Sequence, residues 1–449
     1  MLRLIYSLLL ALVAPVFLYG LFKHKPGKPA VGSRWKEHFG YTPAIDSTVT
    51  ASSTVIIDTA TSHNTTANSS SSSSSSKNKP VVWFHAVSVG EVIAVTPLIK
   101  RYLTQHPDKQ VLLTTTTPTG AEQAEKLAPE VIHRYMPLDF SFAVRGFLAA
   151  IKPVKFIIVE TELWPNTLHE VAKANIPISV INARLSERSC LRYQKVLPIF
   201  RWLSSKLDRV LCQHADDASR FLRLGMNQEK VHVTGSIKFD ISVETDVLFK
   251  GKSLREELGT NRAVWIAAST HQGEDEQVLS AHKKLLESHP NALLILVPRH
   301  PERFNQVADL CQAQGFSLVR RSEKNNALHS GSAVYLADTM GEMMMLLAAS
   351  DVCFMGGSLV GKKVGGHNLL EPAAVGVPSI TGPSYYNFSD ITAQLVAQNG
   401  SAIVSNIEEL ATLLADWLKQ PELLRNMGVN AQQVVDDNKG ALARTLNAI

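Results

Sequence analysis

The chain of 449 residues is too long for a single hydrophobic core and suits two domains of ordinary size. Its 45% hydrophobic and 7% aromatic residues are typical of a globular enzyme. The formal net charge of +5 is mild and does not predict nucleic-acid binding, for which we expect basic clusters interleaved with exposed aromatic residues. It is compatible with an anionic membrane surface or a phosphorylated substrate.

Residues 1–28 predict a membrane anchor. Leu4–Phe22 carries no charged residue and is close to the minimum length that spans a bilayer. Only Arg3 precedes it and several lysines follow it, so the positive-inside rule places the rest of the chain in the cytoplasm. A cleaved signal peptide is the alternative, but no small-x-small cleavage site follows the apolar run. Pro15 keeps open a helix that lies in the membrane interface instead of crossing it.

A polar segment separates the anchor from the first domain. Residues 29–44 connect the two, and residues 45–80 form an insertion rich in Ser and Thr, with unbroken serine from Ser69 to Ser76. Such a composition buries too little apolar surface to offset the entropy of ordering the chain. We therefore expect residues 45–80 to be disordered.

The four cysteines do not have the spacing of a metal site. They are far apart and lie mostly in apolar runs, at Cys190, Cys212, Cys311 and Cys353. Buried free thiols in a reducing compartment are the better interpretation, and no zinc site is expected.

From Val81 onward the chain alternates short runs rich in Val and Ile with amphipathic stretches, which is the pattern of parallel sheets covered by helices. The first series of predicted strands is Val81–Ser88, Gln110–Thr117, Lys155–Glu160, Ile178–Arg184, Arg209–His214 and Val231–Ser236. The second is Ala263–Ser269, Ala292–Pro298, Val334–Asp338, Val352–Gly357 and Pro378–Pro383. Two series predict two doubly wound α/β domains, at residues 81–242 and 243–449.

Ligands of such folds bind outside the carboxyl ends of the strands, so the residues that follow each strand are the candidates for chemistry. Glu91 follows the first strand at a helix start, where a general base and a carboxylate that merely favours the helix dipole are equally good readings. Glu160, Arg184 and Lys238 follow other strands of the first series. Converging carboxylates and cations suit an anionic substrate and a proton transfer.

The second series ends in further polar and glycine-rich loops. Pro298 and Arg299 follow one strand, and a Gly-Gly-His-Asn stretch leads to Glu371. Glycines before a helix offer backbone N–H groups to a phosphate, and Glu371 could accept from a ribose hydroxyl. Neither a P-loop nor a G-x-G-x-x-G pattern occurs, so a simple NTPase or NAD enzyme is not supported.

Nine motifs in order carry a family resemblance: SVGE, TPTG, ETELWPN, NARLS, TGSIKFD, ASTHQGE, LVPRHPERF, DTMGE and GGHNLLEPA. The chain resembles the 3-deoxy-D-manno-octulosonic acid (Kdo) transferases of lipopolysaccharide biosynthesis, from the apolar N-terminus to about Asp390. The Ser-rich insertion departs from the family pattern. The resemblance implies a GT-B fold, with two Rossmann-like lobes facing a cleft, and an N-terminal membrane anchor helix at the cytoplasmic face of the bacterial inner membrane.

The resemblance also implies the reaction and its residues. Kdo would move from CMP-Kdo to the lipid A precursor lipid IV-A, with inversion and without a metal or other cofactor. Glu91 resembles the catalytic base, and Glu160 and Lys238 resemble residues that stabilise the transition state. The residues that resemble a CMP site are Pro298, Arg299, Met340, Gly341, Glu342, Asn368, Leu369, Leu370 and Glu371.

Two other functions fit the same architecture. A sugar-nucleotide 2-epimerase is also two-lobed, but it has no need of an apolar N-terminal segment. A membrane-tethered module that only binds nucleotide sugars would not need carboxylates such as Glu91 and Glu160 at the strand ends. Release of CMP from CMP-Kdo in the presence of a lipid acceptor discriminates among the three.

Overall fold

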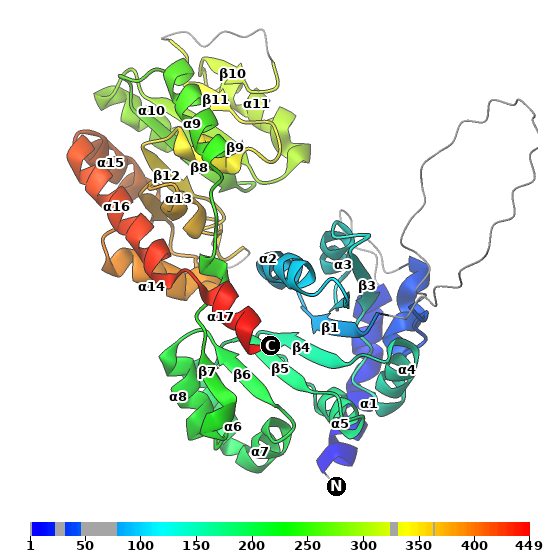
Figure 1. The fold of residues 1–449 in the computed structure, drawn as a ribbon. Coiled ribbons are helices and arrows are strands. Elements are labelled where there is room, and N and C mark those ends of the chain that lie inside the picture. The colour runs from blue at the N-terminus through cyan, green and yellow to red at the C-terminus, as the bar shows by residue number, and fades with distance from the viewer. Residues whose placement is uncertain (1, 23–31, 46–78, 324–330, 362–363) are drawn as a thin grey trace, which may run out of the picture. The chain divides into compact units, whose positions relative to one another are not determined.

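The computed structural model describes residues 2–22, 32–45, 79–323, 331–361 and 364–449. Most of the predicted insertion, residues 46–78, lies outside this part of the chain. The chain folds into two compact units (Figure 1): Met1–Ile237 together with Gly440–Ile449, and Lys238–Lys439.

The first unit is built on a seven-stranded parallel sheet with the order β3-β2-β1-β4-β5-β6-β7. Its strands are β1 Val81–His85, β2 Gln110–Thr115, β3 Val131–Tyr135, β4 Lys155–Val159, β5 Ile178–Ala183, β6 Arg209–Cys212 and β7 Val231–Val233. Its helices are α1 Leu2–Phe22, η1 Gly32–Phe39, α2 Val89–Gln105, α3 Pro118–Glu125, α4 Ser141–Ile151, α5 Pro165–Lys173, α6 Glu187–Lys195, α7 Leu197–Ser204, α8 Ala215–Arg223, η2 Gln228–Lys230 and α17 Ala441–Ala448.

The second unit repeats the plan around a seven-stranded parallel sheet with the order β10-β11-β9-β8-β12-β13-β14. Its strands are β8 Val264–Thr270, β9 Leu293–Pro298, β10 Leu318–Arg320, β11 Val334–Leu336, β12 Val352–Met355, β13 Ser379–Thr381 and β14 Ser401–Ile403. Its helices are α9 Thr245–Leu258, α10 Asp275–Ser288, η4 Pro301–Arg303, α11 Phe304–Ala313, α12 Met343–Ala348, α13 Leu370–Ala374, η6 Tyr386–Phe388, α14 Ser389–Ala397, α15 Ile407–Leu418 and α16 Pro421–Asn438, and η3 Ile237–Phe239 precedes them.

Both sheets are buried on their two faces, which explains why their strands read as continuous apolar runs. In β1, Trp83 belongs to one hydrophobic cluster, where it stacks on Phe156 at 3.8 Å between ring centroids, while Phe84 belongs to the cluster on the other face. In β8, Ile266 and Trp265 are divided between two clusters in the same way. The predicted class, two doubly wound α/β units, is confirmed.

The end of the chain differs from the prediction. The predicted second domain, 243–449, loses Gly440–Ile449 to the first unit, because α17 packs on α2 and buries Leu442 and Leu446 beside β1 and β2. The first unit also ends at Ile237, earlier than the predicted boundary at 242. The residues that follow the predicted boundary form α9, Thr245–Leu258.

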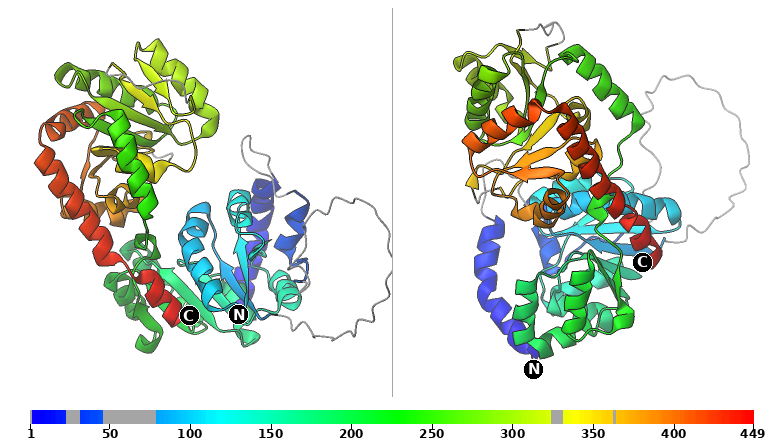
Figure 2. Two further views of the ribbon diagram at one scale, coloured as in Figure 1. Left: turned by 45° about the horizontal axis from the view of Figure 1, so that its top comes forward. Right: turned by 90° about the vertical axis from the view of Figure 1, so that its left-hand side faces the viewer.

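Helix α1 belongs to the first unit and contacts α5 through its first turns, near the N-terminus marked in Figure 2. Arg3 forms an ion pair with Glu170 at 3.4 Å, and the Asn166 amide donates to the Ser7 hydroxyl at 3.0 Å. In the described residues no helix is long and apolar enough to cross a membrane. Several apolar side chains of α1 are nevertheless exposed: Leu8, Leu9, Leu12 and Val13.

Candidate active-site residues at the switch points of the two sheets

Each sheet has one point at which the strand order reverses. In the first sheet β2 and β4 flank β1 on opposite sides, and in the second β9 and β12 flank β8. The loops that leave the carboxyl ends of such neighbours diverge to opposite faces of the sheet and leave a crevice, where ligands of doubly wound folds bind. The β1/β4 pair and the β8/β12 pair are therefore the places to look for chemistry.

Glu91 lies beside the first switch point, in the first turn of α2. Its carboxylate accepts hydrogen bonds from the backbone N–H of Val87 at 2.8 Å and from the Ser88 hydroxyl at 3.0 Å. Burial raises the pKa of Glu91 to about 7, and the charges of Glu160 and Glu162 act in the same direction. A carboxylate whose pKa lies near neutrality is suited to take a proton and release it again.

Glu160 directly follows β4, on the other side of the same switch point. Its φ of +60° lies in the left-handed region, which costs a non-glycine residue about 1–3 kcal/mol and is concentrated at functional sites. Its backbone N–H donates to the Ile181 carbonyl at 2.9 Å, so the turn is held by β5. Glu91 and Glu160 are thus within electrostatic reach of each other. Glu162, whose carboxylate accepts from the Trp164 indole at 3.0 Å, also acts on Glu91.

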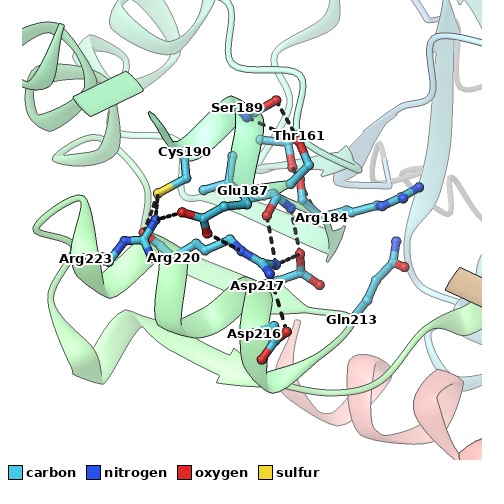
Figure 3. A network of polar contacts seen from close by, with 12 residues as sticks. Thr161, Arg184, Glu187, Ser189, Cys190, Gln213, Asp216, Asp217, Arg220 and Arg223 are labelled. Atoms are coloured by element: carbon cyan, nitrogen blue, oxygen red, sulfur yellow. Dashed lines mark hydrogen bonds and ion pairs between the residues drawn. The ribbon is translucent and has the colours of Figure 1, made fainter. Parts of the chain in front are cut away.

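Arg184 follows β5, and its backbone is tied to the loop after β4. The Thr161 hydroxyl donates to the Arg184 carbonyl at 2.5 Å and accepts from its N–H at 3.2 Å. Figure 3 shows the Arg184 side chain extending away from a separate ionic cluster, in which Glu187 binds Arg220 at 3.1 Å and Arg223 at 2.5 Å. That cluster fixes α6 to α8.

Lys238, the third predicted catalytic residue, is the first residue of the second unit and lies in η3. It is half-buried. Lys238 thus stands where the chain passes from one unit to the other. Its role at the transition state stays a prediction.

The residues predicted for CMP follow three strands of the second sheet. Pro298 ends β9, and Arg299 comes next, with its N–H donating to the Thr270 carbonyl at 3.0 Å. Burial raises the pKa of Glu371, and the charge of Arg299 opposes that shift, so these two predicted residues lie within electrostatic reach of each other.

The remaining predicted residues have mixed surroundings. Met340 is exposed, Gly341 has a φ of +84°, and Glu342 is held by Arg321 at 2.8 Å, which lowers its pKa. The Asn368 side chain accepts from the N–H of Leu370 at 3.1 Å. Leu369 and Leu370 bury their side chains in the core, so only their backbone is available to a nucleotide.

Two features of the second switch point have no predicted role for their side chains, although His271 and Glu274 lie in the motif ASTHQGE and His367 lies in GGHNLLEPA. His271 follows β8, and its Nε2 lies 2.8 Å from Nε2 of His367, which lies in the connection that follows β12. Glu274 is fully buried and accepts four backbone N–H groups, from His271 at 3.2 Å, Gly357 at 2.6 Å, Ser358 at 3.1 Å and Leu359 at 3.0 Å. These contacts join two loops that are distant in sequence, which a spacing pattern cannot reveal.

The part of the chain that the structure describes contains no group of three or more His, Cys, Asp or Glu side chains arranged to hold a metal ion. The four cysteines are buried and free, as the sequence predicts.

Known proteins match both units. Residues 33–241 match the family described as 3-deoxy-D-manno-octulosonic-acid transferase (kdotransferase), and residues 252–434 match glycosyl transferases group 1. The 3-deoxy-D-manno-octulosonic acid transferase of Haemophilus influenzae is 42% identical over 370 residues, which cover 82% of this chain and 86% of that protein. The enzyme of the same name from Bordetella pertussis is 35% identical over 378 residues, with 82% and 86% covered.

Solved structures are also similar. UDP-GlcNAc 2-epimerase from Neisseria meningitidis has a TM-score of 0.52 and 15% identity, covering 82% of this chain and all of that one, which is a likeness of fold alone. The C-terminal CMP-Kdo binding domain of WaaA from Acinetobacter baumannii is 36% identical, covers 42% of this chain and 98% of that one, and has a TM-score of 0.40.

Two doubly wound units, with carboxylates at one switch point and basic residues beside the other, define a glycosyltransferase of the two-Rossmann-domain class. The sequence identity of 42% and 35% to two relatives, each covered over 86% of its length, makes the family assignment specific. The chain belongs to the 3-deoxy-D-manno-octulosonic acid (Kdo) transferase family.

Proposed function

We propose that this enzyme transfers Kdo from CMP-Kdo to a hydroxyl of the lipid A precursor, with inversion at the sugar, and that Glu91 is the general base. The observation that carries this proposal is the position of Glu91 beside the first switch point, with a pKa raised to about 7 by burial. An acceptor hydroxyl is a poor nucleophile, and a base of this pKa can take its proton as the new bond forms.

Glu160 and Lys238 support the transition state in this proposal. Glycosyl transfer develops positive charge on the sugar, and the second carboxylate at the β1/β4 switch point can stabilise that charge. The same charge disfavours ionisation of Glu91, which contributes to its raised pKa. Lys238 would offset the negative charge of the departing CMP, and Arg184 would attract the carboxylate of the sugar.

The nucleotide is assigned to the second unit. Arg299 would bind the phosphate, and Glu371 would accept a hydrogen bond from the ribose. Arg299 follows β9, Glu371 lies in the first turn of α13, and the two side chains are within electrostatic reach of each other. Met340, Gly341 and Glu342 follow β11, the neighbour of β9, and would complete the cytidine site.

Attachment to the bacterial inner membrane, at its cytoplasmic side, is part of the proposal. Helix α1 holds to the unit through Arg3 and Ser7 while it exposes Leu8, Leu9 and Leu12. A helix with these properties suits burial of an apolar face in the lipid interface, parallel to the membrane surface. A lipid acceptor would lie in the membrane, so an enzyme that acts on it would need such a helix to stay at the membrane surface.

An assay of CMP release tests the reaction. Purified enzyme with CMP-Kdo and lipid IV-A should release CMP and yield an acceptor heavier by Kdo, whereas UDP-GlcNAc should not be epimerised. Absence of a Kdo-bearing product, with the donor and acceptor both intact, would refute the transferase proposal. The resemblance to epimerases is one of fold alone and favours no epimerase activity.

A further inference from the structure

We propose that His271 and His367 form a proton-sharing pair that binds the phosphate of the nucleotide donor and takes up one proton together with it. This inference rests on the proposed function, since it assigns the phosphate to the second switch point. It adds two residues outside the predicted CMP site and a protonation step.

The pair is defined by its geometry. Nε2 of His271 and Nε2 of His367 lie 2.8 Å apart, and the two rings meet edge to edge, with 5.1 Å between their centroids and 10° between their planes. At this distance one nitrogen must donate and the other must accept, because two N–H groups facing each other would repel. The contact therefore holds one proton, and the pair can gain one more, at Nδ1, without breaking.

The rings are held in place by backbone. A Cβ built on Gly357 would lie 3.0 Å from Cδ2 of His367, so the ring packs directly on the backbone of Gly357. Gly357 also has a φ of +70°, a conformation that favours glycine at this position. The Gly366 N–H donates to the Gly357 carbonyl at 3.0 Å, and Glu274 accepts from the N–H of His271. The pair is thus part of the fixed frame of the β8/β12 switch point.

The charges around the pair are mostly positive. Arg299, Arg303 and His300 come from the segment after β9, and the ring of His300 meets that of His271 edge-on at 5.4 Å. Arg303 is paired with Asp275, and Tyr386 faces the connecting loop at Gly365. The carboxylates of this region already have partners. Asp275 binds Arg303, Glu302 lies 3.8 Å from His300, and Glu274 accepts four backbone N–H groups. Glu371 is half-buried within electrostatic reach of Arg299.

These surroundings keep the empty pair neutral. Burial, followed by the neighbouring positive charges, lowers the pKa of His271 and of His367 to about 4. A phosphate that binds between the pair and Arg299 reverses the local field and raises both pKa values, so a proton enters from solvent. When the bond between sugar and phosphate breaks and its electron pair stays on the phosphate, the protonated pair stabilises the added charge.

Calorimetry of CMP binding to the full chain tests the inference, with titrations at pH 7 in buffers of different ionisation enthalpy. The wild-type enzyme should take up a measurable fraction of a proton per CMP bound. His271→Asn and His367→Asn should each reduce that uptake and weaken CMP binding about 10- to 100-fold. His289→Asn, at a half-buried histidine of the same unit that follows α10, should behave as wild type.

The outcomes separate the two proposals. Equal proton uptake in the wild type and in both histidine variants would overturn the proton-sharing pair while leaving the CMP site in place. If the variants do not fold, the wild-type enzyme can still test the inference by comparison of two ligands. Cytidine, which lacks the phosphate, should bind without proton uptake. Equal proton uptake for cytidine and CMP would overturn the proposed proton-sharing pair. Failure of wild-type enzyme to bind CMP at all would refute both the pair and the donor site.

Discussion

Ser88 and Glu91 hydrogen-bond to each other in both directions at the start of α2. The Glu91 N–H donates to the Ser88 hydroxyl at 3.4 Å, and that hydroxyl donates to the Glu91 carboxylate at 3.0 Å. This is a variant of the capping box, in which the carboxylate returns to the Ser88 hydroxyl and the Val87 N–H, and a purely structural role would account for it. Its surroundings nevertheless raise the pKa of Glu91 to about 7, which a solvated cap residue would not show. The two roles therefore coexist in one side chain and need an experiment that separates them.

Arg299→Ala should weaken binding of both CMP and CMP-Kdo. The lost charge-assisted contact to the phosphate is worth about 1.5–3 kcal/mol, or roughly 10- to 150-fold in the dissociation constant. Calorimetry measures this directly, and Arg425→Ala, an exposed arginine on α16, is the control. An unchanged affinity for CMP would remove Arg299 from the phosphate site.

Glu274→Gln should destabilise the second unit. Whichever oxygen the amide nitrogen replaces, two of the four N–H groups then face another N–H donor, and each unsatisfied buried donor costs about 1–3 kcal/mol. We expect a loss of about 2–6 kcal/mol in the free energy of unfolding, measured by chemical denaturation. Glu276→Gln, an exposed residue in the same first turn of α10, should change stability by less than about 0.5 kcal/mol. Comparable stability of the two variants would contradict the role given to Glu274.

Replacement of the exposed apolar residues of α1 by serine, at Leu8, Leu9, Leu12 and Val13, should release the enzyme from liposomes. Because burial of a Leu or Val side chain contributes about 1.5–3 kcal/mol, four losses should weaken partitioning by about 100-fold or more. Flotation measures this, while CMP affinity reports that the donor site stays intact. Val429→Ser, at an exposed apolar residue of α16, is the matched control. Full retention on the membrane after a high-salt wash would show that α1 is not the anchor.

The central strands could be predicted from the sequence, whereas three of the four edge strands in the described sheets could not. Strands such as β1 and β9 are buried on both faces and appear as unbroken apolar runs. The three strands that the sequence did not predict, β3, β10 and β14, all lie at sheet edges. In β3, His133 and Arg134 interrupt the apolar run because an edge strand faces less of the core.

The candidate site shows the same division between local and tertiary information. Glu91 and Glu160 could be found because Glu91 lies in the first helical turn after an apolar strand and Glu160 directly follows another. Parallel topology brings the ends of such strands to one edge of the sheet. The contact between His271 and His367 joins residues 96 positions apart, and no local pattern encodes the 2.8 Å between their nitrogens. Likewise, the return of α17 to the first unit depends on a complementary apolar surface on α2.

Glu91→Gln separates the base from the cap. The amide can still accept from the Val87 N–H through its oxygen and donate to the Ser88 hydroxyl through its nitrogen, so the helix start is preserved. It cannot take a proton, and kcat should therefore fall about 10²- to 10⁴-fold, while CMP affinity and thermal stability change little. Glu409→Gln is a close control, because Glu409 donates its N–H to the cap residue Asn406 at 2.9 Å and accepts the N–H of Ser405 at the start of α15.

The pH dependence of kcat/KM tests the same role of Glu91 independently. A base must be ionised to act, and the pKa of Glu91 is raised to about 7, so kcat/KM of the wild type should fall about tenfold per pH unit below that value and level off above it. This fall in kcat/KM at low pH should be absent from the residual activity of Glu91→Gln and unchanged in Glu409→Gln. Near-wild-type turnover in Glu91→Gln would leave the capping box as the whole role of Glu91. Glu160, across the same switch point, would then become the candidate for the base.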